Sequence, residues 1–171
     1  MKVLLGELQP VDGLVWLNSN VRIAYFTQHA VDQLNLGVSA VEWLKTLFPG
    51  TPEVECRRHL GRFGILGEIS LMQIGNLSGG QKSRLAFAIM CWKEPHLIIM
   101  DEPTNHLDDE TIDVLAKAIQ EFKGAVLIIS HDQYFLGKTI KEFWSIHDRK
   151  LRTFDSLEAC KRATYQQIAV E

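Results

Sequence analysis

The sequence has few of the features that mark a secreted, membrane-spanning or disulfide-stapled protein. Its three cysteines are odd in number, lie far apart and form no C-x-x-C pair. A disulfide framework or a zinc site is therefore not expected, and reduced thiols are the simpler interpretation. No apolar run approaches the ~20 residues of a membrane-spanning helix, and the N-terminus lacks the layout of a signal peptide. These absences predict a cytoplasmic protein.

The sequence also lacks an excess of positive charge. A formal net charge of −3 gives no general basic field, so composition does not indicate binding to nucleic acid or to an anionic membrane. What is present suits one ordinary globular domain, because 46% of the 171 residues are hydrophobic and 23% are charged. That apolar share is enough for a core.

Hydrophobic periodicity predicts strands that alternate with helices. Between residues 38 and 75 the spacing is helical, with Val41, Leu44 and Leu47 on one stripe. Alternation of this kind favours an α/β domain with a mainly parallel sheet and a helical insertion. The expected elements are the end of a helix over 1–10, strands over 14–16 and 21–26, helices over 38–75, a helix over 78–92, a strand over 97–100, a helix over 109–122, a strand buried on both faces over 125–129, a helix over 133–139, strands over 142–146 and 151–154, and a closing helix from Ser156.

The run Leu77-Ser78-Gly79-Gly80-Gln81 begins one of the expected helices with two glycines. Free backbone N–H groups and the positive end of the helix dipole form an anion site there, and Ser78 adds a hydroxyl donor. Ser78 and Gln81 also have the spacing of a capping box, which needs no ligand. From these residues alone, phosphate binding and simple capping are both open.

Two carboxylates, Asp101 and Glu102, end the expected strand over 97–100. Asp101 can hold Mg²⁺, and Glu102 can orient and polarise an attacking water. The alternative is an acidic pair that only ends a strand. Asp108 is placed as the N-cap of the next helix.

His131 and Gln28 also follow expected strands. His131 can contact a terminal phosphate or bond only to local backbone, and Gln28 alone is a weak signal. Ligands of parallel sheets gather beyond the carboxyl ends of the strands, which is where Gln28, Asp101, Glu102 and His131 all fall. Their joint occurrence favours a nucleotide site.

These residues resemble the motifs of ATP-binding cassette ATPases. Leu77–Gln81 matches the signature sequence, residues 97–102 the Walker B strand, Gln28 the Q-loop and His131 the switch histidine. The run Glu102-Pro103-Thr104-Asn105-His106-Leu107-Asp108 is similar to the ABC-F subfamily, soluble twin-cassette proteins that act on ribosomes and translation. The similarity extends over nearly the whole chain, and it is greatest to the second cassette of eukaryotic ABC-F proteins.

The resemblance implies a partial P-loop NTPase fold over residues 1–171, with a helical and signature subdomain over 38–95. It implies ATP and Mg²⁺ as cofactors, a second cassette as partner, the ribosome as partner of a full-length protein, and no membrane partner. Glu102 and His131 would be catalytic, and Asp101 and Gln28 would hold the metal. The nucleotide would contact Gln28, Ser78, Gly79, Gly80, Gln81 and Asp108.

A phosphate-binding loop, G-x-x-x-x-G-K followed by Ser or Thr, is missing from these residues. The nearest approach, over 75–83, places Lys82 one residue late and follows no buried strand. The resemblance implies that the chain starts just downstream of that loop. In this family the strand before the loop lies between the strands expected at 125–129 and 142–146, so we expect both to have unpaired edges and the isolated chain to be marginally stable.

Three functions fit the sequence. The first is a partial ABC-F cassette whose complete form is an ATPase; by itself, such a chain should bind ATP weakly and not hydrolyse it. The second is a protein that binds partners without catalysis and offers its signature helix to another cassette. The third is the nucleotide-binding subunit of a transporter, which Asn105 and His106 disfavour.

Overall fold

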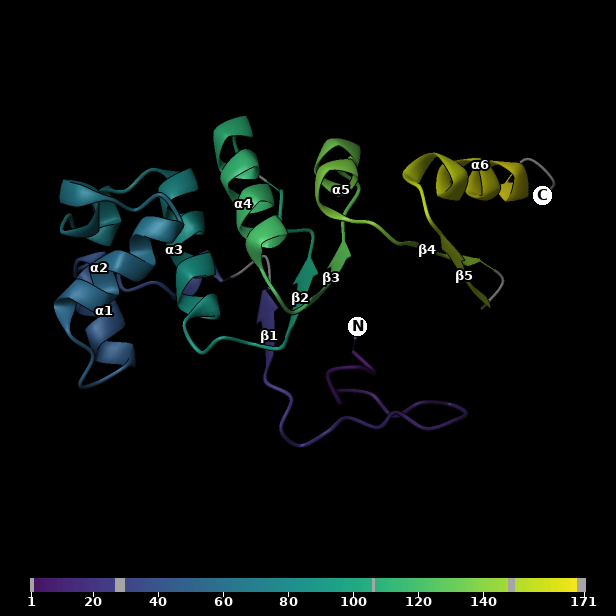
Figure 1. Ribbon diagram of the computed structural model, residues 1–171, viewed down its shortest axis with the longest axis horizontal. Coiled ribbons are helices and arrows are strands. Elements are labelled where there is room, and N and C mark those ends of the chain that lie inside the picture. The colour runs from purple at the N-terminus through teal and green to yellow at the C-terminus, as the bar shows by residue number, and fades with distance from the viewer. Residues whose placement is uncertain (1, 27–29, 106, 148–149, 169–171) are drawn as a thin grey trace.

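A three-stranded parallel sheet forms the centre of the computed structural model, which describes residues 2–26, 30–105, 107–147 and 150–168 (Figure 1). Its strands are β1 (Ile23–Phe26), β2 (Leu97–Asp101) and β3 (Ala125–Ile129), in the order β1-β2-β3. Ile23 lies opposite Leu97, which in turn lies opposite Ala125. All three strands therefore end at the same edge of the sheet.

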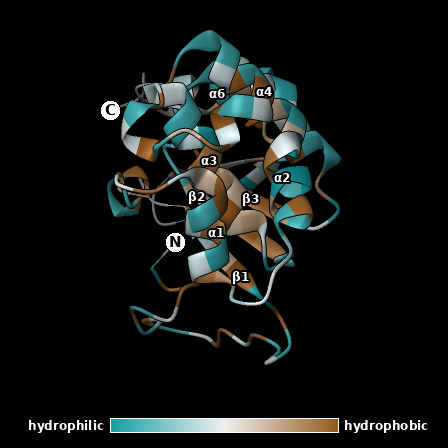
Figure 2. Cartoon of the chain, turned by 90° about the vertical axis from the view of Figure 1, so that its left-hand side faces the viewer, coloured by the Kyte–Doolittle hydropathy of each residue, from teal (hydrophilic) through white to brown (hydrophobic). Residues whose placement is uncertain are grey.

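Strand β2 is central because its side chains are apolar on both faces. Ile98, Ile99 and Met100 are each at most 2% exposed. A strand with neighbours on both sides and cover on both faces is expected to read as a continuous apolar run, as this one does. In Figure 2 the strands are mostly hydrophobic, whereas the helices around them also carry hydrophilic residues.

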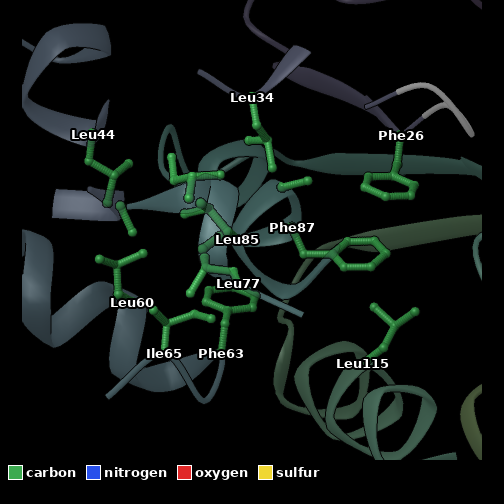
Figure 3. Close-up of a cluster of buried hydrophobic side chains, with 14 of the residues drawn as sticks. Phe26, Leu34, Leu44, Leu60, Phe63, Ile65, Leu77, Leu85, Phe87 and Leu115 are labelled. Carbon is green, nitrogen blue, oxygen red and sulfur yellow. The ribbon is translucent and has the colours of Figure 1, made fainter. Parts of the chain in front are cut away.

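Helices α1 (Ala40–Leu47), α2 (Glu53–Arg62) and α3 (Gly79–Cys91) pack on one side of this sheet (Figure 1). Phe87 of α3 stacks on Phe26 of β1 with ring centroids 3.9 Å apart, which joins the helices to the sheet (Figure 3). Three 3-10 turns link the elements: η1 (Val31–Gln33), η2 (Gly67–Ser70) and η3 (Ile74–Asn76).

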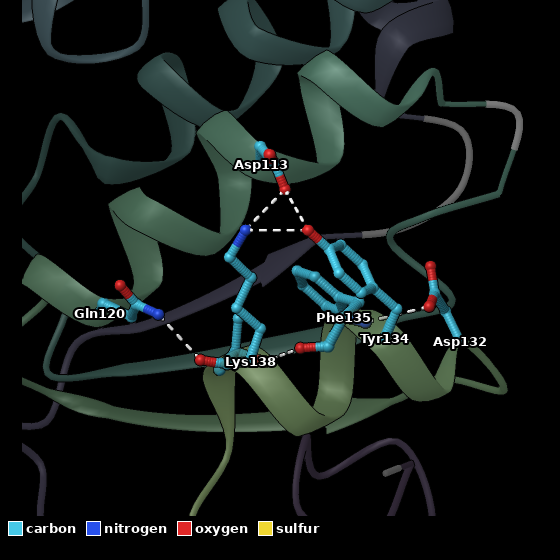
Figure 4. A network of polar contacts seen from close by, with 7 residues as sticks. Asp113, Gln120, Asp132, Tyr134, Phe135 and Lys138 are labelled. Carbon is cyan, nitrogen blue, oxygen red and sulfur yellow. Dashed lines mark hydrogen bonds and ion pairs between the residues drawn. The ribbon is translucent and has the colours of Figure 1, made fainter.

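Two further helices, α4 (Asp109–Glu121) and α5 (Gln133–Thr139), follow β2 and β3. A polar cluster on their surfaces ties them together (Figure 4). The Lys138 ammonium lies 2.8 Å from the Asp113 carboxylate, and the Tyr134 hydroxyl donates to the same carboxylate at 3.1 Å. These two hydrogen bonds are the main reason that the pKa of Asp113 is lowered.

The C-terminal part forms a hairpin and a helix. Strands β4 (Phe143–His147) and β5 (Lys150–Phe154) pair antiparallel, and α6 (Leu157–Ile168) packs against them. Helix α6 also contacts α5. In the described part of the chain β4 pairs only with β5, and β3 pairs only with β2. The unpaired edges expected for these strands are therefore present.

Several sequence expectations need correction. Residues 2–8 form hydrogen-bonded turns with Gly6 at φ +75°, not the end of a helix. Residues 14–16 form no strand, and Leu14 and Trp16 are largely exposed.

The run over 125–129 is a strand, but it is not buried on both faces. As an edge strand it leaves Ile129 47% exposed. The spacing of apolar residues reports only a local preference for a strand or helix. In these segments no described strand pairs with residues 14–16, and none pairs with the outer edge of β3.

The remaining expected elements are present. Helices occur within 38–75, the capping box begins α3, and α5 has the expected bounds. No helix in the described ranges is long and apolar enough to cross a membrane.

Lowering the pH should destabilise the contact between α2 and α3 through His59. Its ring donates from Nε2 to the Ala88 carbonyl at 2.7 Å and lies edge-on to Trp92. Burial lowers the pKa of His59; Arg62 adds to this, while the Ala88 bond, Glu55 and Glu94 oppose it. The unfolded chain therefore binds the proton more readily, so the free energy of unfolding should be constant above about pH 6.5 and fall below it.

The measurement is urea denaturation at several pH values. His59→Gln keeps an N–H donor but cannot titrate, and it should flatten this part of the pH profile. Val54→Ala, an exposed change on the same helix, is the control and should leave the profile unchanged. An unaltered profile for His59→Gln would contradict the assignment.

Candidate functional site

The carboxyl ends of β2 and β3 place three of the predicted site residues at one edge of the sheet. Asp101, the last residue of β2, lies opposite Ile129, the last residue of β3. The Glu102 N–H then donates to the Ile129 carbonyl at 2.8 Å, which extends the pairing by one residue. His131 lies two residues beyond the end of β3.

Glu102 and His131 are in direct contact. His131 Nδ1 lies 2.8 Å from Glu102 Oε2, and the His131 backbone N–H donates to the same oxygen at 3.4 Å. Because an ionised carboxylate can only accept, Nδ1 carries the proton in this bond. The Glu102 side chain is 28% exposed and that of His131 is 75% exposed, so the pair faces solvent. The sequence placed both at strand ends but did not predict their contact.

Glu102 has a left-handed backbone, with φ +47°. A residue other than glycine costs roughly 1–3 kcal/mol in this conformation, which persists only where the surroundings enforce it. Here the bond to Ile129 holds the backbone, and the bonds to His131 hold the side chain. The strain therefore falls at a predicted catalytic residue.

Three polar residues that sequence reasoning did not assign to the site, Thr104, Ser130 and Asp132, form hydrogen bonds around the turn that carries His131. The Thr104 and Ser130 hydroxyls lie 3.4 Å apart, and Ser130 Oγ accepts from the Asp132 N–H at 3.0 Å. Asp132 in turn caps α5 by accepting from the Phe135 N–H at 3.0 Å. Ser-x-Asp before a helix is the spacing that suggests such a turn.

The signature residues lie at the N-terminus of α3. The Ser78 hydroxyl accepts from the Gln81 N–H at 3.2 Å, and the Gln81 side chain accepts from the Ser78 N–H at 2.9 Å. The capping box thus uses the Gln81 carbonyl, whereas the Ser78 hydroxyl proton remains available. Backbone N–H groups of Gly79 and Gly80 make no hydrogen bond to the described residues. They form the anion-binding end of the helix.

The two glycines have different surroundings. A Cβ at Gly79 would meet nothing within 4 Å, whereas a Cβ at Gly80 would lie 2.2 Å from Thr111 Oγ1 and 3.0 Å from Asp108 Oδ2. Gly79 therefore leaves room for a ligand, and Gly80 leaves room for α4. The sequence did not distinguish them.

Asp108 caps α4, as expected, by accepting from the Thr111 N–H at 2.7 Å. The pKa of Asp108 is lowered by the adjacent Thr111 hydroxyl and N–H. That hydroxyl is buried and lies beside the carboxylate without a hydrogen bond of good geometry. Arg84 of α3 reaches Glu110 of α4 at 3.3 Å, a second link between the two helices.

The chemistry of the donors at the sheet edge suits Mg²⁺, because Asp101 and Glu102 offer hard carboxylate oxygens. The described residues contain no group of three or more potential metal ligands. Gln28, the other predicted metal ligand, lies outside the described residues.

The loop-like run over 75–83 is not a phosphate loop. Its first residues form η3 and its last residues form the start of α3, so no strand leads into it. The Lys82 ammonium donates back to the Gly75 carbonyl at 3.1 Å.

The difference between the two glycines can be tested by substitution. Gly80→Ala should lower the free energy of unfolding by roughly 1–3 kcal/mol, as overpacking does, whereas Gly79→Ala should have little effect. Adding Thr111→Ala to Gly80→Ala removes the clashing oxygen and should restore most of the stability. Urea denaturation of the three variants checks this. Equal costs for the two glycines, or no recovery in the double variant, would contradict it.

The family profile described as ABC transporter matches residues 1–105. ATP-binding cassette sub-family F member 3 of Mus musculus is 51% identical over 144 residues, 84% of this chain and 20% of that protein. Protein GCN20 of Saccharomyces cerevisiae is 44% identical over 155 residues, 91% of this chain and 21% of that protein. This chain thus spans about a fifth of the length of these relatives.

The fold is similar to that of cbiO1 from Clostridium perfringens, described as part of the ABC transporter complex cbiONQ. The TM-score is 0.72 at 19% identity, over 99% of this chain and 77% of that one. This likeness concerns the fold alone. From the family profile and the two sub-family relatives together, the chain belongs to the ABC transporter family of ATP-binding cassettes and is of the ABC-F type.

Proposed function

We propose that this chain supplies the signature helix and the acid–histidine end of an ABC-F module that binds and hydrolyses MgATP. The observation that carries the proposal is the 2.8 Å contact between Glu102 and His131 beside Asp101, at the edge of a parallel sheet where ligands gather. The family generally binds ATP with Mg²⁺, which neutralises phosphate charge.

At this edge we assign each residue a role. Asp101 would hold Mg²⁺, and Gln28, which lies outside the described residues, would be the second protein ligand. Glu102 accepts a proton from the attacking water, and His131 donates its ring N–H. That N–H is bonded to Glu102, which fixes the orientation of the ring. A terminal phosphate would compete for the same donor and so release the carboxylate for its water.

The signature end serves a different nucleotide. Ser78 and the N–H groups of Gly79 and Gly80 begin a helix of 13 residues, and they suit the terminal phosphate of an ATP held by another cassette. Gln81 and Asp108 act indirectly, because their side chains are used to cap α3 and α4. The partner is therefore a second cassette, which contacts the subdomain over residues 38–95.

Further assignments follow from the ABC-F type. A full-length protein of this type would work on the ribosome in the cytoplasm, without a membrane partner. The second candidate is a non-catalytic cassette segment that lends its signature helix to a partner. The free N–H groups at the start of α3 support it, since they need no site on this chain's own sheet edge. A transporter subunit is a third candidate, supported only by the likeness in fold to cbiO1.

A chimera separates catalysis from partner binding. This chain would replace the matching 144 residues of the Mus musculus relative, and ATP binding and hydrolysis would be measured on the purified protein. Glu102→Gln should retain ATP binding but lower the hydrolysis rate about 100-fold or more, because the base is lost. Glu121→Gln, an exposed acid at the end of α4, is the matched control. Undiminished hydrolysis by Glu102→Gln would exclude the catalytic role.

The chain alone should bind ATP weakly and show no steady hydrolysis, since none of its residues form a phosphate loop. Isothermal titration calorimetry and a phosphate-release assay on the pure chain check this. Hydrolysis that survives repurification and is lost in Glu102→Gln would show that the chain completes a site without such a loop.

A further inference from the structure

Helix α5 directly follows the turn that carries His131, and it depends on its neighbours for support. Asp132 is the N-cap of this helix, and its carbonyl accepts from the Leu136 N–H at 3.0 Å. A helix of seven residues is not stable alone in water, so packing against other elements must hold it in place. Among its residues, all of which are described, only Phe135 is buried. A single buried side chain fixes the position of a helix better than it fixes the rotation.

A second attachment lies on the surface, between α5 and the longer helix α4 (Figure 4). Oδ1 of Asp113 accepts from the Lys138 ammonium at 2.8 Å and from the Tyr134 hydroxyl at 3.1 Å. The same ammonium donates to the Tyr134 hydroxyl at 3.0 Å, and Gln120 Nε2 donates to the Lys138 carbonyl at 2.8 Å. We call Asp113, Tyr134 and Lys138 the α4–α5 cluster. Because Tyr134 lies near the start of α5 and Lys138 near its end, the cluster holds this helix along its length.

Helix α4 is a firm base for the cluster, because several of its side chains pack in the core. Four of them are each at most 8% exposed: Ile112, Leu115, Ala116 and Ile119. The cluster itself is at the surface, where Tyr134 is 60% exposed. Ion pairs at such exposed sites contribute little to folding stability. The cluster is therefore better suited to fix the orientation of α5 than to stabilise the whole fold.

We propose that the α4–α5 cluster is a latch that orients His131 toward Glu102, with Asp113 as its central positioning residue. The latch fixes the rotation of α5, and the N-cap at Asp132 carries that rotation to the preceding residue. His131 Nδ1 is then held 2.8 Å from Glu102 Oε2. The consequence for hydrolysis rests on the proposed function, whereas the effect on the His131 ring does not.

The ring proton of His131 reports the latch in the full chain. Long-range proton–nitrogen correlation spectra at about pH 9, where imidazoles are neutral, show which ring nitrogen carries the proton. Loss of signals in His131→Gln identifies those of His131, and circular dichroism checks that each variant is folded. The unaltered chain should carry the proton on Nδ1, because Glu102 accepts there. Asp113→Ala should shift the proton toward Nε2, the form that an unrestrained neutral imidazole prefers.

Substitutions of two lysines give a matched comparison. Lys138→Met removes the ammonium of the latch and should also shift the ring proton toward Nε2, whereas Lys138→Arg keeps a donor for Asp113 and should leave it on Nδ1. Lys117→Met, at an exposed site on α4, is the control and should behave like the unaltered chain.

Gly137→Ala separates the orientation of α5 from its helical stability. A Cβ at Gly137 would meet nothing within 4 Å, so alanine favours the helix there without a clash. Added to Asp113→Ala, it should raise the midpoint of urea denaturation but leave the ring proton on Nε2. Return of the proton to Nδ1 in this double variant would show that the cluster only stabilises the helix, and would overturn the proposal.

Hydrolysis by the chimera measures the consequence for the proposed function. Asp113→Ala should lower kcat about tenfold with little change in KM for ATP, because a donor is misplaced while binding is retained. In a His131→Ala background, Asp113→Ala should have no further effect, because the residue through which it acts is gone.

Two further results would contradict the latch: a ring proton that stays on Nδ1 in Asp113→Ala, or an undiminished effect of Asp113→Ala in the His131→Ala background. The proposed function fails separately. If the ring proton shifts as expected while hydrolysis by the chimera is unaffected by Glu102→Gln, the latch is supported and the catalytic role of Glu102 is excluded.

Discussion

The burial of β2 between its two neighbours is the constraint on which the rest of the structure depends. Ile98, Ile99 and Met100 fill both faces of the sheet, so the strand cannot shift without moving apolar side chains into water. This fixes where Asp101 and Glu102 leave the sheet. β3 is held in register by β2 and delivers His131 to the same edge. Two carboxylates and an imidazole thus meet because an apolar strand has only one stable position.

The contact between α3 and α4 is the second constraint. Gly80 lets the cap of α4 approach the first turn of α3 so closely that one added methyl group would meet the Thr111 oxygen. The capping residues Ser78 and Asp108 therefore lie in one small region, although they belong to motifs about 30 residues apart in sequence. The first turns of α3 and α4 are therefore packed directly against each other.

Much of this could be predicted from sequence because it is local. Capping residues, apolar runs and the strand-end positions of Asp101, Glu102 and His131 depend on neighbours within a few residues. What failed depends on distant partners. Residues 14–16 have the composition of a strand, but a strand needs a paired neighbour, and β3 needs a second neighbour to be buried. The different roles of Gly79 and Gly80 and the Glu102–His131 contact arise from elements that are far apart in the chain.

The left-handed backbone at Glu102 means that the residue best suited to this conformation is not the residue that the proposed chemistry needs. Glycine there would adopt φ +47° without strain and would regain about 1 kcal/mol or more, while it removed the carboxylate that binds His131. Random substitution screened for thermal stability alone would therefore tend to select against the residue that the proposed chemistry needs. The strain at this position is the cost at which the chain places a carboxylate beside His131.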